Sequence, residues 1–362
     1  RRESSIRDSM RTLIVGGLGF VGSYYTSHAL TRGDDVVVLD SGFLGAVCDL
    51  NAQKLLDHPK VANLRIIRDT VADDAAVTHA LKIYDGVDRV LHAAAQASTQ
   101  RAIEQPRLDF TINMAGTFNV LEGVRSFSPD AHVVLLGSHR VWDVSSRPVE
   151  TVGKRVRWVG SSLGPSDRWP LSVKPRDARG ASCVGGIYYT HAYARMYGLS
   201  VIYGIPCGIY GPHQFGGSNW RQVADDRWLS WFVVAHALGI PLQVPGTGHQ
   251  TWDMLYITDA LSAIDVLFDH ATKHKGEVLN VGGGPKGLLP HLEAIDLIEQ
   301  FLHKKTSIEL VAEQPWDDPV FVTNIESMLG LGWFPLVTLT QGIEEACQWA
   351  ERNYGILRRL YG

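Results

Sequence analysis

The chain has 362 residues, of which 45% are hydrophobic and 20% are charged, and its formal net charge is −4. This composition is ordinary for a globular protein and excludes a disordered chain. The sequence has no long basic run, and no apolar stretch approaches the ~20 residues that a membrane helix needs. We therefore expect neither a nucleic acid nor a membrane as a partner.

The cysteines and histidines indicate neither a disulfide framework nor a metal site. The four cysteines are far apart and form no Cys-x-x-Cys pair: Cys48, Cys183, Cys207 and Cys347. This spacing favours reduced thiols in a cytoplasmic protein. We expect His249, His270 and His274 to be solvated, and we predict no metal site.

From Arg11 onward, short apolar runs alternate with longer amphipathic stretches. The polar residues 1–9 lack the apolar core of a secretion signal, and we expect a tail there that is disordered or foreign to the natural chain. Strands are expected at 12–15, 36–39, 64–67, 89–92, 132–136 and 200–203, and helices near 20–31 and 181–197. Apolar runs without polar alternation suit strands that are buried on both faces. The pattern predicts an α/β fold with a doubly wound, Rossmann-type parallel sheet, whose ligand binds at the carboxyl ends of the strands.

Two later regions have a different pattern. Residues 143–178 are rich in Ser, Pro, Arg and Gly and show no clear period, which predicts an inserted lid or binding loop. Beyond Gly211 the chain is mixed and rich in aromatic residues, with helices expected at 231–238 and 257–270 and strands at 242–244 and 278–281. We expect this part to form a smaller C-terminal α/β lobe.

A glycine-rich turn, Val15-Gly-Gly-Leu-Gly-Phe-Val-Gly22, joins the first strand to the first helix. Glycine permits the close backbone approach that a pyrophosphate needs, and the helix N-terminus offers free N–H groups. Asp40 ends the second strand, where a carboxylate accepts the ribose hydroxyls of NAD. Asp40 would repel a 2′-phosphate and neither Ser41 nor Gly42 is basic, so NAD is favoured over NADP. The alternative is a glycine-rich turn of some other α/β protein, with Asp40 as a cap.

Several further segments follow in a recognisable order. They are His92-Ala-Ala-Ala-Gln96, Asn113, Tyr197-Gly-Leu199, the run 206–215, Tyr256-Ile-Thr-Asp-Ala260 and Leu331-Gly-Trp-Phe-Pro335. Together with the glycine-rich turn, they resemble the extended short-chain dehydrogenase/reductases, the family of NAD-dependent nucleotide-sugar epimerases and dehydratases. The resemblance covers nearly the whole chain from Met10.

The resemblance implies a domain plan and a cofactor site. Residues 10–210 would form the NAD-binding Rossmann domain, with 143–178 inserted, and 211–362 mainly a substrate-binding lobe with some segments returning to the first domain. The family usually forms homodimers through the helices that carry Asn113 and residues 181–197. The implied cofactor contacts are Gly16, Gly19, Phe20, Val21, Gly22, Asp40, Asp69, Thr70, Ala93, Ala94, Ala95, Asn113 and Pro206.

Members of this family typically remove a proton with the Tyr of a Tyr-x-x-x-Lys motif. The Lys lowers the pKa of the phenol, which is otherwise a poor base at neutral pH, and a Ser or Thr orients the substrate hydroxyl. The spacing to Tyr197 puts this motif at 179–183, so Arg179 replaces the Tyr and Cys183 replaces the Lys, while the hydroxyl survives as Ser138. Three tyrosines on the same helix lie at the wrong angle or too far along to substitute: Tyr188, Tyr189 and Tyr193.

The candidates for catalysis are therefore Ser138, His139, Arg179 and Cys183. A guanidinium stays protonated, so Arg179 is no base, but it can bind an anion or polarise a carbonyl. Cys183 is either a thiolate activated by that cation or, as we favour, a small buried thiol in the space of the lysine. His139 is the base nearest in sequence, and a structural role is equally open for it.

The substrate side also departs from the family. Where relatives carry an Arg that binds the substrate's diphosphate, this chain has Trp252, and Ile205 replaces another Arg on the sixth strand. A flat apolar surface in place of an anion clamp favours an aromatic or polycyclic substrate over a nucleotide diphosphate. The predicted substrate-binding residues are Gln96, Arg140, Gln214 and Trp252.

Three functions are open at this point. The first is a non-redox dehydration, cyclisation or isomerisation of a small molecule, such as a sugar-derived or aromatic specialised metabolite, with NAD as a structural or electrostatic element. The second is a redox epimerase or dehydratase that uses a substitute base, such as His139 or a residue of 143–178. The third is a non-catalytic, NAD-responsive binding protein.

Overall fold

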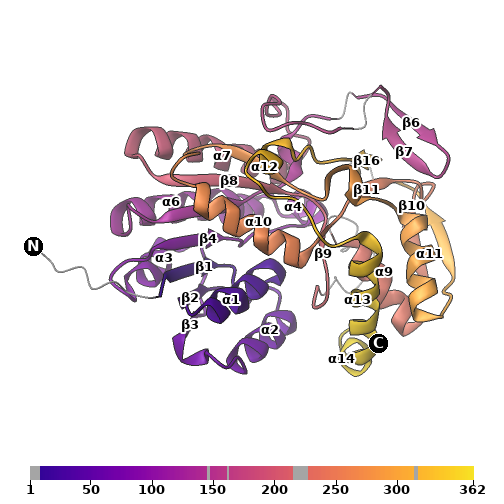
Figure 1. Ribbon diagram of the computed structural model, residues 1–362, viewed down its shortest axis with the longest axis horizontal. Helices are drawn as coiled ribbons and strands as arrows, with labels where there is room; N and C mark the ends of the chain where they lie inside the picture. The colour runs from indigo at the N-terminus through magenta and orange to yellow at the C-terminus, as the bar shows by residue number, and fades with distance from the viewer. Residues whose placement is uncertain (1–8, 145–146, 161–162, 215–226, 314–316) are drawn as a thin grey trace, which may run out of the picture.

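The apolar runs of the N-terminal half form one parallel sheet in the computed structural model, which describes residues 9–144, 147–160, 163–214, 227–313 and 317–362. Its seven strands are β1 (Arg11–Val15), β2 (Asp35–Leu39), β3 (Leu64–Ile67), β4 (Arg89–His92), β5 (His132–Leu136), β8 (Ser200–Pro206) and β13 (Val278–Val281). They lie in the order β13-β8-β5-β4-β1-β2-β3, and each neighbouring pair is parallel (Figure 1). The predicted Rossmann-type sheet is therefore confirmed.

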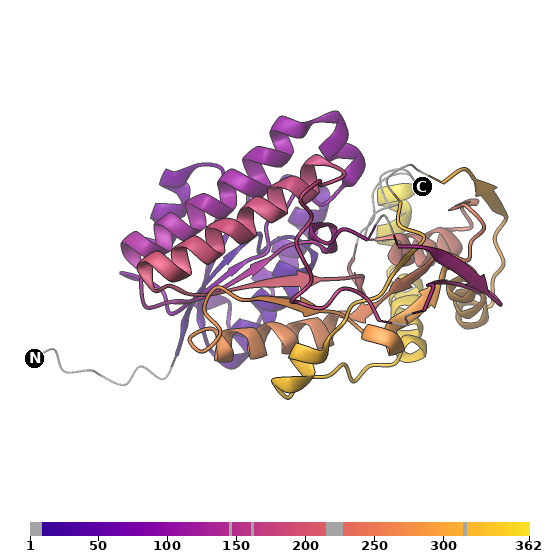
Figure 2. The same ribbon diagram turned by 90° about the horizontal axis from the view of Figure 1, so that it is seen from above.

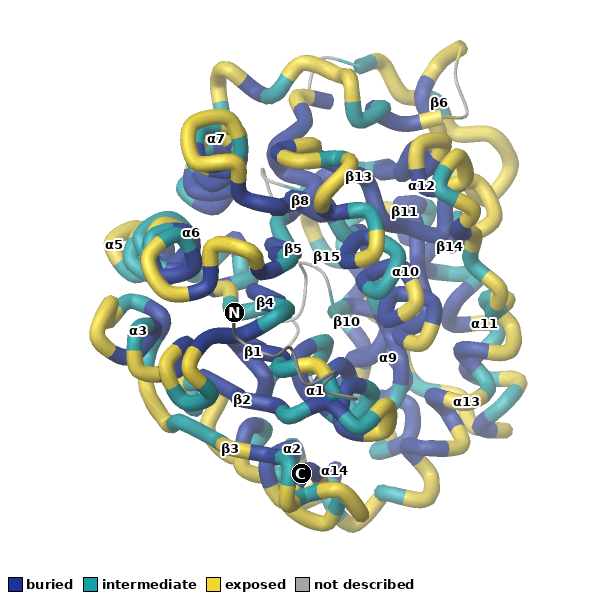
Figure 3. The backbone as a smooth tube through the Cα atoms, turned by 60° about the vertical axis from the view of Figure 1, so that its left-hand side comes forward, coloured by how far each residue is buried: buried dark blue, intermediate teal, exposed yellow. Residues whose placement is uncertain are grey.

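Helices cover both faces of this sheet (Figure 2). One face carries α3 (Asp74–Lys82), α6 (Gly116–Phe127) and α7 (Ala178–Tyr197), and the other carries α1 (Phe20–Arg32), α2 (Ala46–Leu56) and α10 (Ile257–His270). Central residues such as Leu13, Ile14 and Val90 are fully buried. Figure 3 shows the same division, with buried strands inside and exposed outer faces on the helices. Burial on both faces explains why these strands are continuous apolar runs.

Capping residues determine both ends of α1 and the start of α7. Helix α1 begins after Gly19 and ends at Gly33, whose backbone is left-handed (φ 98°) and whose N–H bonds to Ala29 and Leu30 carbonyls. Helix α7 begins one turn earlier than the sequence predicted, at Ala178, because the Asp177 carboxylate accepts the Gly180 N–H as a cap.

The C-terminal part forms a second lobe of small sheets and helices. Its strand pairs are β10 (Leu242–Pro245) with β15 (Ile308–Val311), β9 (Ile209–Tyr210) with β12 (Leu255–Tyr256), and β11 (Thr251–Asp253) with both β14 (Leu288–Pro290) and β16 (Val320–Phe321). Its helices are α9 (Trp228–Leu238), α11 (His291–Leu302), α12 (Glu326–Gly330), α13 (Leu339–Arg352) and α14 (Tyr354–Tyr361). Helix α10 and strand β13 return to the first domain, where β13 forms one edge of the sheet.

The inserted segment contains a hairpin that the sequence analysis did not predict. Strands β6 (Val149–Val152) and β7 (Arg155–Trp158) pair antiparallel. The hairpin lies on the C-terminal lobe, because the Val156 N–H donates to the His249 carbonyl and the Trp158 ring packs 6.1 Å from Phe321. The segment therefore packs against the second lobe in this structure. None of its described residues lines the large cavity at the carboxyl ends of the strands.

Some expectations concern residues that the structure does not describe. Residues 1–8 of the predicted tail lie outside the described residues, and so do residues 215–226. Within the described ranges, none of the helices has the length and apolar character needed to cross a membrane.

Asp253 should make the stability of the second lobe depend on pH. It is fully buried, and its carboxylate accepts the Thr323 and Gly284 N–H groups. Burial raises its pKa from 3.8 to about 7, against the effect of these hydrogen bonds. The folded state thus holds a proton that the unfolded chain releases, so this group's contribution to stability falls as the pH rises from about 4 to about 7.

Asp253→Asn removes that titration. As the pH rises from about 5.5 to about 8.5, we expect the free energy of unfolding of the wild-type to fall relative to that of the variant. Urea denaturation at each pH measures both. A difference between the two proteins that stays constant over this range would contradict the assignment.

Candidate functional site

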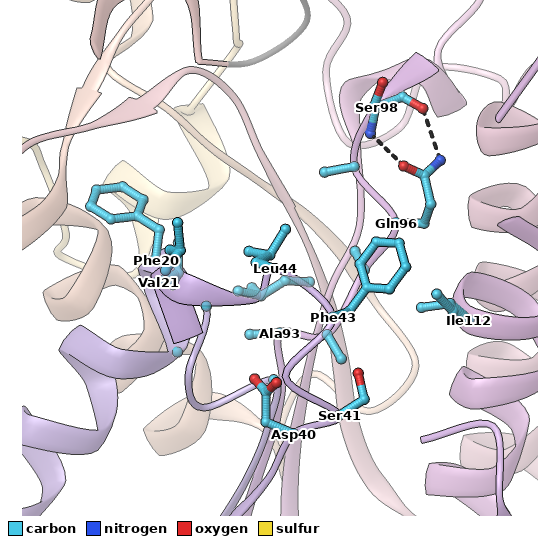
Figure 4. A pocket seen from close by; sticks show the side chains of 18 of the residues that line it. Phe20, Val21, Asp40, Ser41, Phe43, Leu44, Ala93, Gln96, Ser98 and Ile112 are labelled. Carbon is cyan, nitrogen blue, oxygen red and sulfur yellow. Dashed lines mark hydrogen bonds between the residues drawn. The ribbon is translucent and has the colours of Figure 1, made fainter. Parts of the chain in front are cut away.

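A cavity of about 720 Å³ lies at the carboxyl ends of the parallel strands. Residues that follow β1, β2, β4, β5 and β8 line it: Gly16, Asp40, Ala93, Gly137 and Cys207. Figure 4 shows Asp40, Ala93 and the first residues of α1, Phe20 and Val21, around this space. Its position and size are those of a ligand site in a doubly wound fold.

The turn between β1 and α1 requires glycine at two positions. Gly16 has a left-handed backbone (φ 84°), and a Cβ there would lie 2.5 Å from the Ala94 nitrogen. A Cβ at Gly22 would lie 2.0 Å from the Gly16 carbonyl oxygen. The turn thus packs closely against the end of β4 and leaves the N-terminus of α1 open to the cavity, as a bound pyrophosphate needs.

Backbone N–H groups hold the Asp40 carboxylate at the end of β2. Oδ2 accepts the Leu18 N–H at 2.9 Å, and Oδ1 accepts the Gly42 N–H at 2.8 Å. The Cys48 thiol also donates to Oδ1, at 3.8 Å. A carboxylate has about four acceptor positions, so one remains for a ribose hydroxyl. The site therefore fits the adenosine half of a dinucleotide.

The structure places almost the whole predicted cofactor set on the cavity wall. Asn113 is the exception. Its side chain instead brackets the Gln96 backbone, accepting the N–H at 2.8 Å and donating to the carbonyl at 3.0 Å. The residues on the wall are Gly16, Gly19, Phe20, Val21, Gly22, Asp40, Asp69, Thr70, Ala93, Ala94, Ala95 and Pro206. Their contact with a cofactor remains a prediction.

Arg179 is the one candidate catalytic residue that the structure places on the cavity wall, although only 5% of its surface is exposed. Cys183 lies one turn further along α7 and is buried away from the cavity. Burial raises the pKa of its thiol to about 11. The raised pKa of the thiol favours a packing role for Cys183 over the thiolate alternative, and a part for Cys183 in catalysis remains a prediction.

Ser138 and His139 do not line the cavity. Ser138 is buried and caps the short helix η3 (His139–Val141) by accepting the Arg140 N–H. The His139 ring is buried 4.5 Å from the Phe321 ring and 5.3 Å from Trp252. The turn of η3 points this side chain into the second lobe, so the hypothesis that His139 is a base in the cavity is wrong for this structure.

Two of the predicted substrate-binding residues are also elsewhere. Trp252 is 6% exposed and packs in the core of the second lobe, so it offers no stacking surface to a ligand in the cavity. Arg140 is paired with Asp177 at 3.3 Å, and both side chains are almost fully buried. The argument for an aromatic or polycyclic substrate, which rested on Trp252, therefore lacks structural support.

Gln96 and Gln214 do line the cavity, but their amides already have protein partners. The Gln96 side chain exchanges two hydrogen bonds with the Ser98 backbone (Figure 4). Gln214 donates to the Ile209 carbonyl at 2.8 Å and accepts the Ser230 hydroxyl. Both residues shape the wall, and a direct substrate contact remains a prediction for each.

The cavity wall also carries functional side chains that were not predicted from the sequence, such as Arg101 and Glu104; two more of them are His213 and Arg227. His213 has a left-handed backbone (φ 62°), which is uncommon for residues other than glycine and is found more often at functional sites. Burial lowers its pKa to about 4, so its imidazole is neutral at neutral pH. His213 lies within the quoted run 206–215, whereas Arg227 precedes a helix that the sequence analysis began three residues too late.

The chain matches a known protein family. A model of the NAD-dependent epimerase/dehydratase family matches residues 12–282. The chain therefore belongs to the NAD-dependent epimerase/dehydratase family, as the resemblance indicated, and NAD is the cofactor of that family.

Its relatives are epimerases and dehydratases. CDP-paratose 2-epimerase of Salmonella typhi is 26% identical over 348 residues, which is 94% of this chain and 99% of the relative. The dTDP-glucose 4,6-dehydratase of Xanthomonas campestris is 28% identical, over 94% of this chain and 93% of the relative.

Solved structures show the same fold. A dTDP-glucose 4,6-dehydratase of Bacillus anthracis, solved in complex with NAD, has a TM-score of 0.76 and 26% identity, covering 97% of this chain and 100% of that chain. An epimerase of Methanothermobacter thermautotrophicus has a TM-score of 0.78 at 19% identity, covering 97% of this chain and 95% of that chain. Among the described residues of the present chain, no cluster of His, Cys, Asp and Glu could hold a metal ion.

The buried pair of Arg140 and Asp177 gives a test of the site's framework. Removing one partner of a buried pair leaves an uncompensated charge, so we expect Arg140→Ala to lower the free energy of unfolding by about 3–5 kcal/mol. As a matched control, Arg157→Ala breaks the exposed pair of Arg157 and Glu150 and should cost no more than about 1 kcal/mol. Urea denaturation measures both. A loss for Arg140→Ala as small as that of the control would contradict a structural role.

Proposed function

We propose that the cavity holds NAD together with a small-molecule substrate, and that the protein catalyses a non-redox dehydration, cyclisation or isomerisation of that substrate. One observation carries the proposal: a buried arginine, Arg179, lies on the cavity wall, and a buried neutral thiol, Cys183, lies one turn further along α7. By their spacing to Tyr197, we take these two residues to stand where the family resemblance implies the Tyr and the Lys. The pair that would make a phenolate base is therefore missing.

The described residues fit NAD at the adenosine and pyrophosphate end. The α1 N-terminus and the close turn at Gly16 suit the pyrophosphate, and Asp40 suits a ribose with a free 2′-hydroxyl rather than a 2′-phosphate. Strands β2 and β5 are three strand spacings apart, roughly 14 Å. A dinucleotide that lies across the strand ends can thus extend from Asp40 to Gly137, beside Arg179. Bound NAD would supply a hydride acceptor or, in the reaction proposed here, a fixed positive charge.

Arg179 then acts as an electrostatic group rather than as a base. A guanidinium on a buried wall donates hydrogen bonds to oxygen and favours negative charge that develops on a substrate carbonyl or leaving group. Such stabilisation assists elimination or isomerisation without an exchange of hydride. Proton transfer would need a group from the substrate, from solvent or from another wall residue.

A redox reaction with a substitute base is the second candidate, and His213 is the observation in its favour. Its imidazole is on the cavity wall and is neutral. However, a conjugate acid with a pKa of about 4 makes it a weak base at neutral pH. This weakness is why we rank the non-redox reaction first.

A spectroscopic experiment separates these candidates. The NAD-loaded protein is mixed with UDP-glucose, dTDP-glucose and other candidate substrates while the absorbance of reduced nicotinamide is followed and products are identified by mass spectrometry. We expect conversion without reduction of the nicotinamide. Transient reduction would support the redox candidate. Tight NAD binding without conversion of any compound would contradict both enzymatic functions and support an NAD-responsive binding protein.

We also propose that the protein forms a homodimer through α6 and α7. Several large apolar side chains on these helices are exposed: Phe118, Tyr188, Tyr189, Met196 and Tyr197. Tyr188 is 56% and Met196 68% exposed, and residues eight apart lie on one side of a helix. Exposed apolar side chains on neighbouring helices are typical of a protein interface.

The proposed dimer interface can be tested by introducing charged side chains into it. We expect the wild-type chain to be a dimer in light scattering, and Tyr188→Glu/Met196→Glu to be a monomer, because the interface would bury the introduced carboxylates. Leu336→Glu introduces the same charge at another exposed apolar residue, 73% exposed, and should remain a dimer. A wild-type monomer at every concentration would contradict the proposal.

A further inference from the structure

An aromatic ring and a cation meet across the cavity at the carboxyl ends of the strands. Phe43 and Arg101 both line this cavity, and the guanidinium carbon lies 5.0 Å from the centre of the ring. This distance is within the range of a cation–π attraction. Figure 4 shows the Phe43 ring turned toward Gln96 and Ile112. The contact therefore joins two sides of the cavity.

The two residues follow strands that are not neighbours in the sheet. Phe43 follows β2 and Arg101 follows β4, and β1 lies between these strands, so the strands are roughly 10 Å apart. Gly16 follows β1 and is buried in the same cavity, whereas Phe43 is 47% exposed. The contact therefore passes over the turn on which we expect the pyrophosphate, and it lies nearer to solvent than that turn.

Arg101 is held on a firmly anchored helix. It belongs to α4 (Thr99–Glu104), which Ser98 caps by accepting the Arg101 N–H at 3.2 Å. The Gln96 side chain holds Ser98 through two hydrogen bonds (Figure 4), and α4 packs against α7. The cation is thus tied to the framework of the first domain.

Phe43, in contrast, lies in a turn between two glycines. Gly42 (φ 72°) and Gly45 (φ 58°) are both left-handed, and the Gly45 N–H donates to the Gly42 carbonyl at 2.8 Å. A Cβ at Gly45 would meet no heavy atom of the described residues within 4 Å. Glycine adopts such backbone angles at little cost, and short loops of this kind absorb the angle changes of a hinge. The turn can therefore carry the ring toward Arg101 or away from it.

We infer that Phe43 and Arg101 form a gate over the pyrophosphate of bound NAD, and that NAD enters and leaves only when the two side chains separate. This inference rests on the proposed function, because it concerns the exchange of the same cofactor. The proposed reaction does not consume NAD, so the cofactor needs no exit in each turnover. A single cation–π contact at an exposed site is weak enough to open spontaneously.

The test measures how fast NAD enters and leaves the full chain. Quenching of tryptophan fluorescence in a stopped-flow instrument follows association, and a chase of radiolabelled NAD with unlabelled NAD follows dissociation. We expect Phe43→Leu and Arg101→Gln each to raise both rate constants about twofold to fivefold, as the loss of an exposed cation–π contact predicts. The equilibrium affinity for NAD should change little, because the same contact must open for entry and for exit.

A double variant and two controls show whether the pair acts as one unit. Phe43→Leu/Arg101→Gln should exchange NAD no faster than either single variant, because both changes remove the same contact. Phe43→Trp keeps an aromatic face and should keep the slow exchange. Phe127→Leu breaks the contact of Lys82 with Phe127, 4.1 Å apart and not on the cavity wall. It is the matched control and should leave both rate constants unchanged.

The rate constants also show how the inference can fail. A faster dissociation with unchanged association, and hence a weaker affinity, would show that the side chains only contact NAD and would overturn the gate. Unchanged rate constants in both single variants would overturn it as well. The NAD site itself would stand in either case. No NAD binding by the wild-type would contradict the proposed function, and the gate with it.

Discussion

The close approach of the β1–α1 turn to the end of β4 is the constraint on which the site depends. Gly16 lies so near the Ala94 backbone that no side chain fits between them, and Gly22 lies as near to Gly16. This contact fixes where α1 begins and therefore where its free N–H groups point. The same turn donates the Leu18 N–H to Asp40, so the geometry of the turn also positions the carboxylate one strand away. An anion-binding helix end and a hydroxyl-binding carboxylate are thus set by one local packing arrangement.

By the spacing to Tyr197, the wall beside β5 and α7 lacks the Tyr and Lys that the family resemblance implies. A phenol and an ammonium would place a titratable pair next to the cavity, whereas Arg179 and Cys183 place a permanent cation and a neutral thiol there. Neighbouring residues agree with that change. Tyr203 packs its ring against Gly137, where a Cβ would lie 2.1 Å from the ring, and Cys183 is itself buried. The core under the wall is therefore filled, with little room for a long amine side chain at position 183.

Sequence reasoning predicted the sheet because its physical signal is strong. Strands that are buried on both faces read as unbroken apolar runs, and glycines in a tight turn have no substitute. The hairpin of β6 and β7 was missed because it is short and half exposed, so its alternation of Arg155, Val156, Arg157 and Trp158 spans only four residues. His139 was misplaced for a different reason. Because His139 follows Ser138 in the sequence, the two residues were expected in one site. One turn of η3 instead directs the imidazole toward the Phe321 ring, and a turn of this kind has no periodic signal in the sequence.

The same limit explains why the buried carboxylate Asp109 could not be found from the sequence. It accepts the Ser182 hydroxyl and an Asn113 N–H, and a π-helix, η2 (Phe110–Ala115), follows it. A carboxylate near a proline and an aromatic residue predicts a solvated cap, and the π-helix that buries it has no simple sequence signature. Two buried arginines, Arg140 and Arg179, differ in where their charge lies. Arg140 is neutralised by Asp177, directly and away from the cavity, so its charge serves the start of α7. Arg179 is on the cavity wall. Burying a cation costs stability unless it is paired or hydrogen-bonded. The charge of Arg140 is thus used within the fold, whereas the charge of Arg179 lies where it can meet negative charge in a ligand.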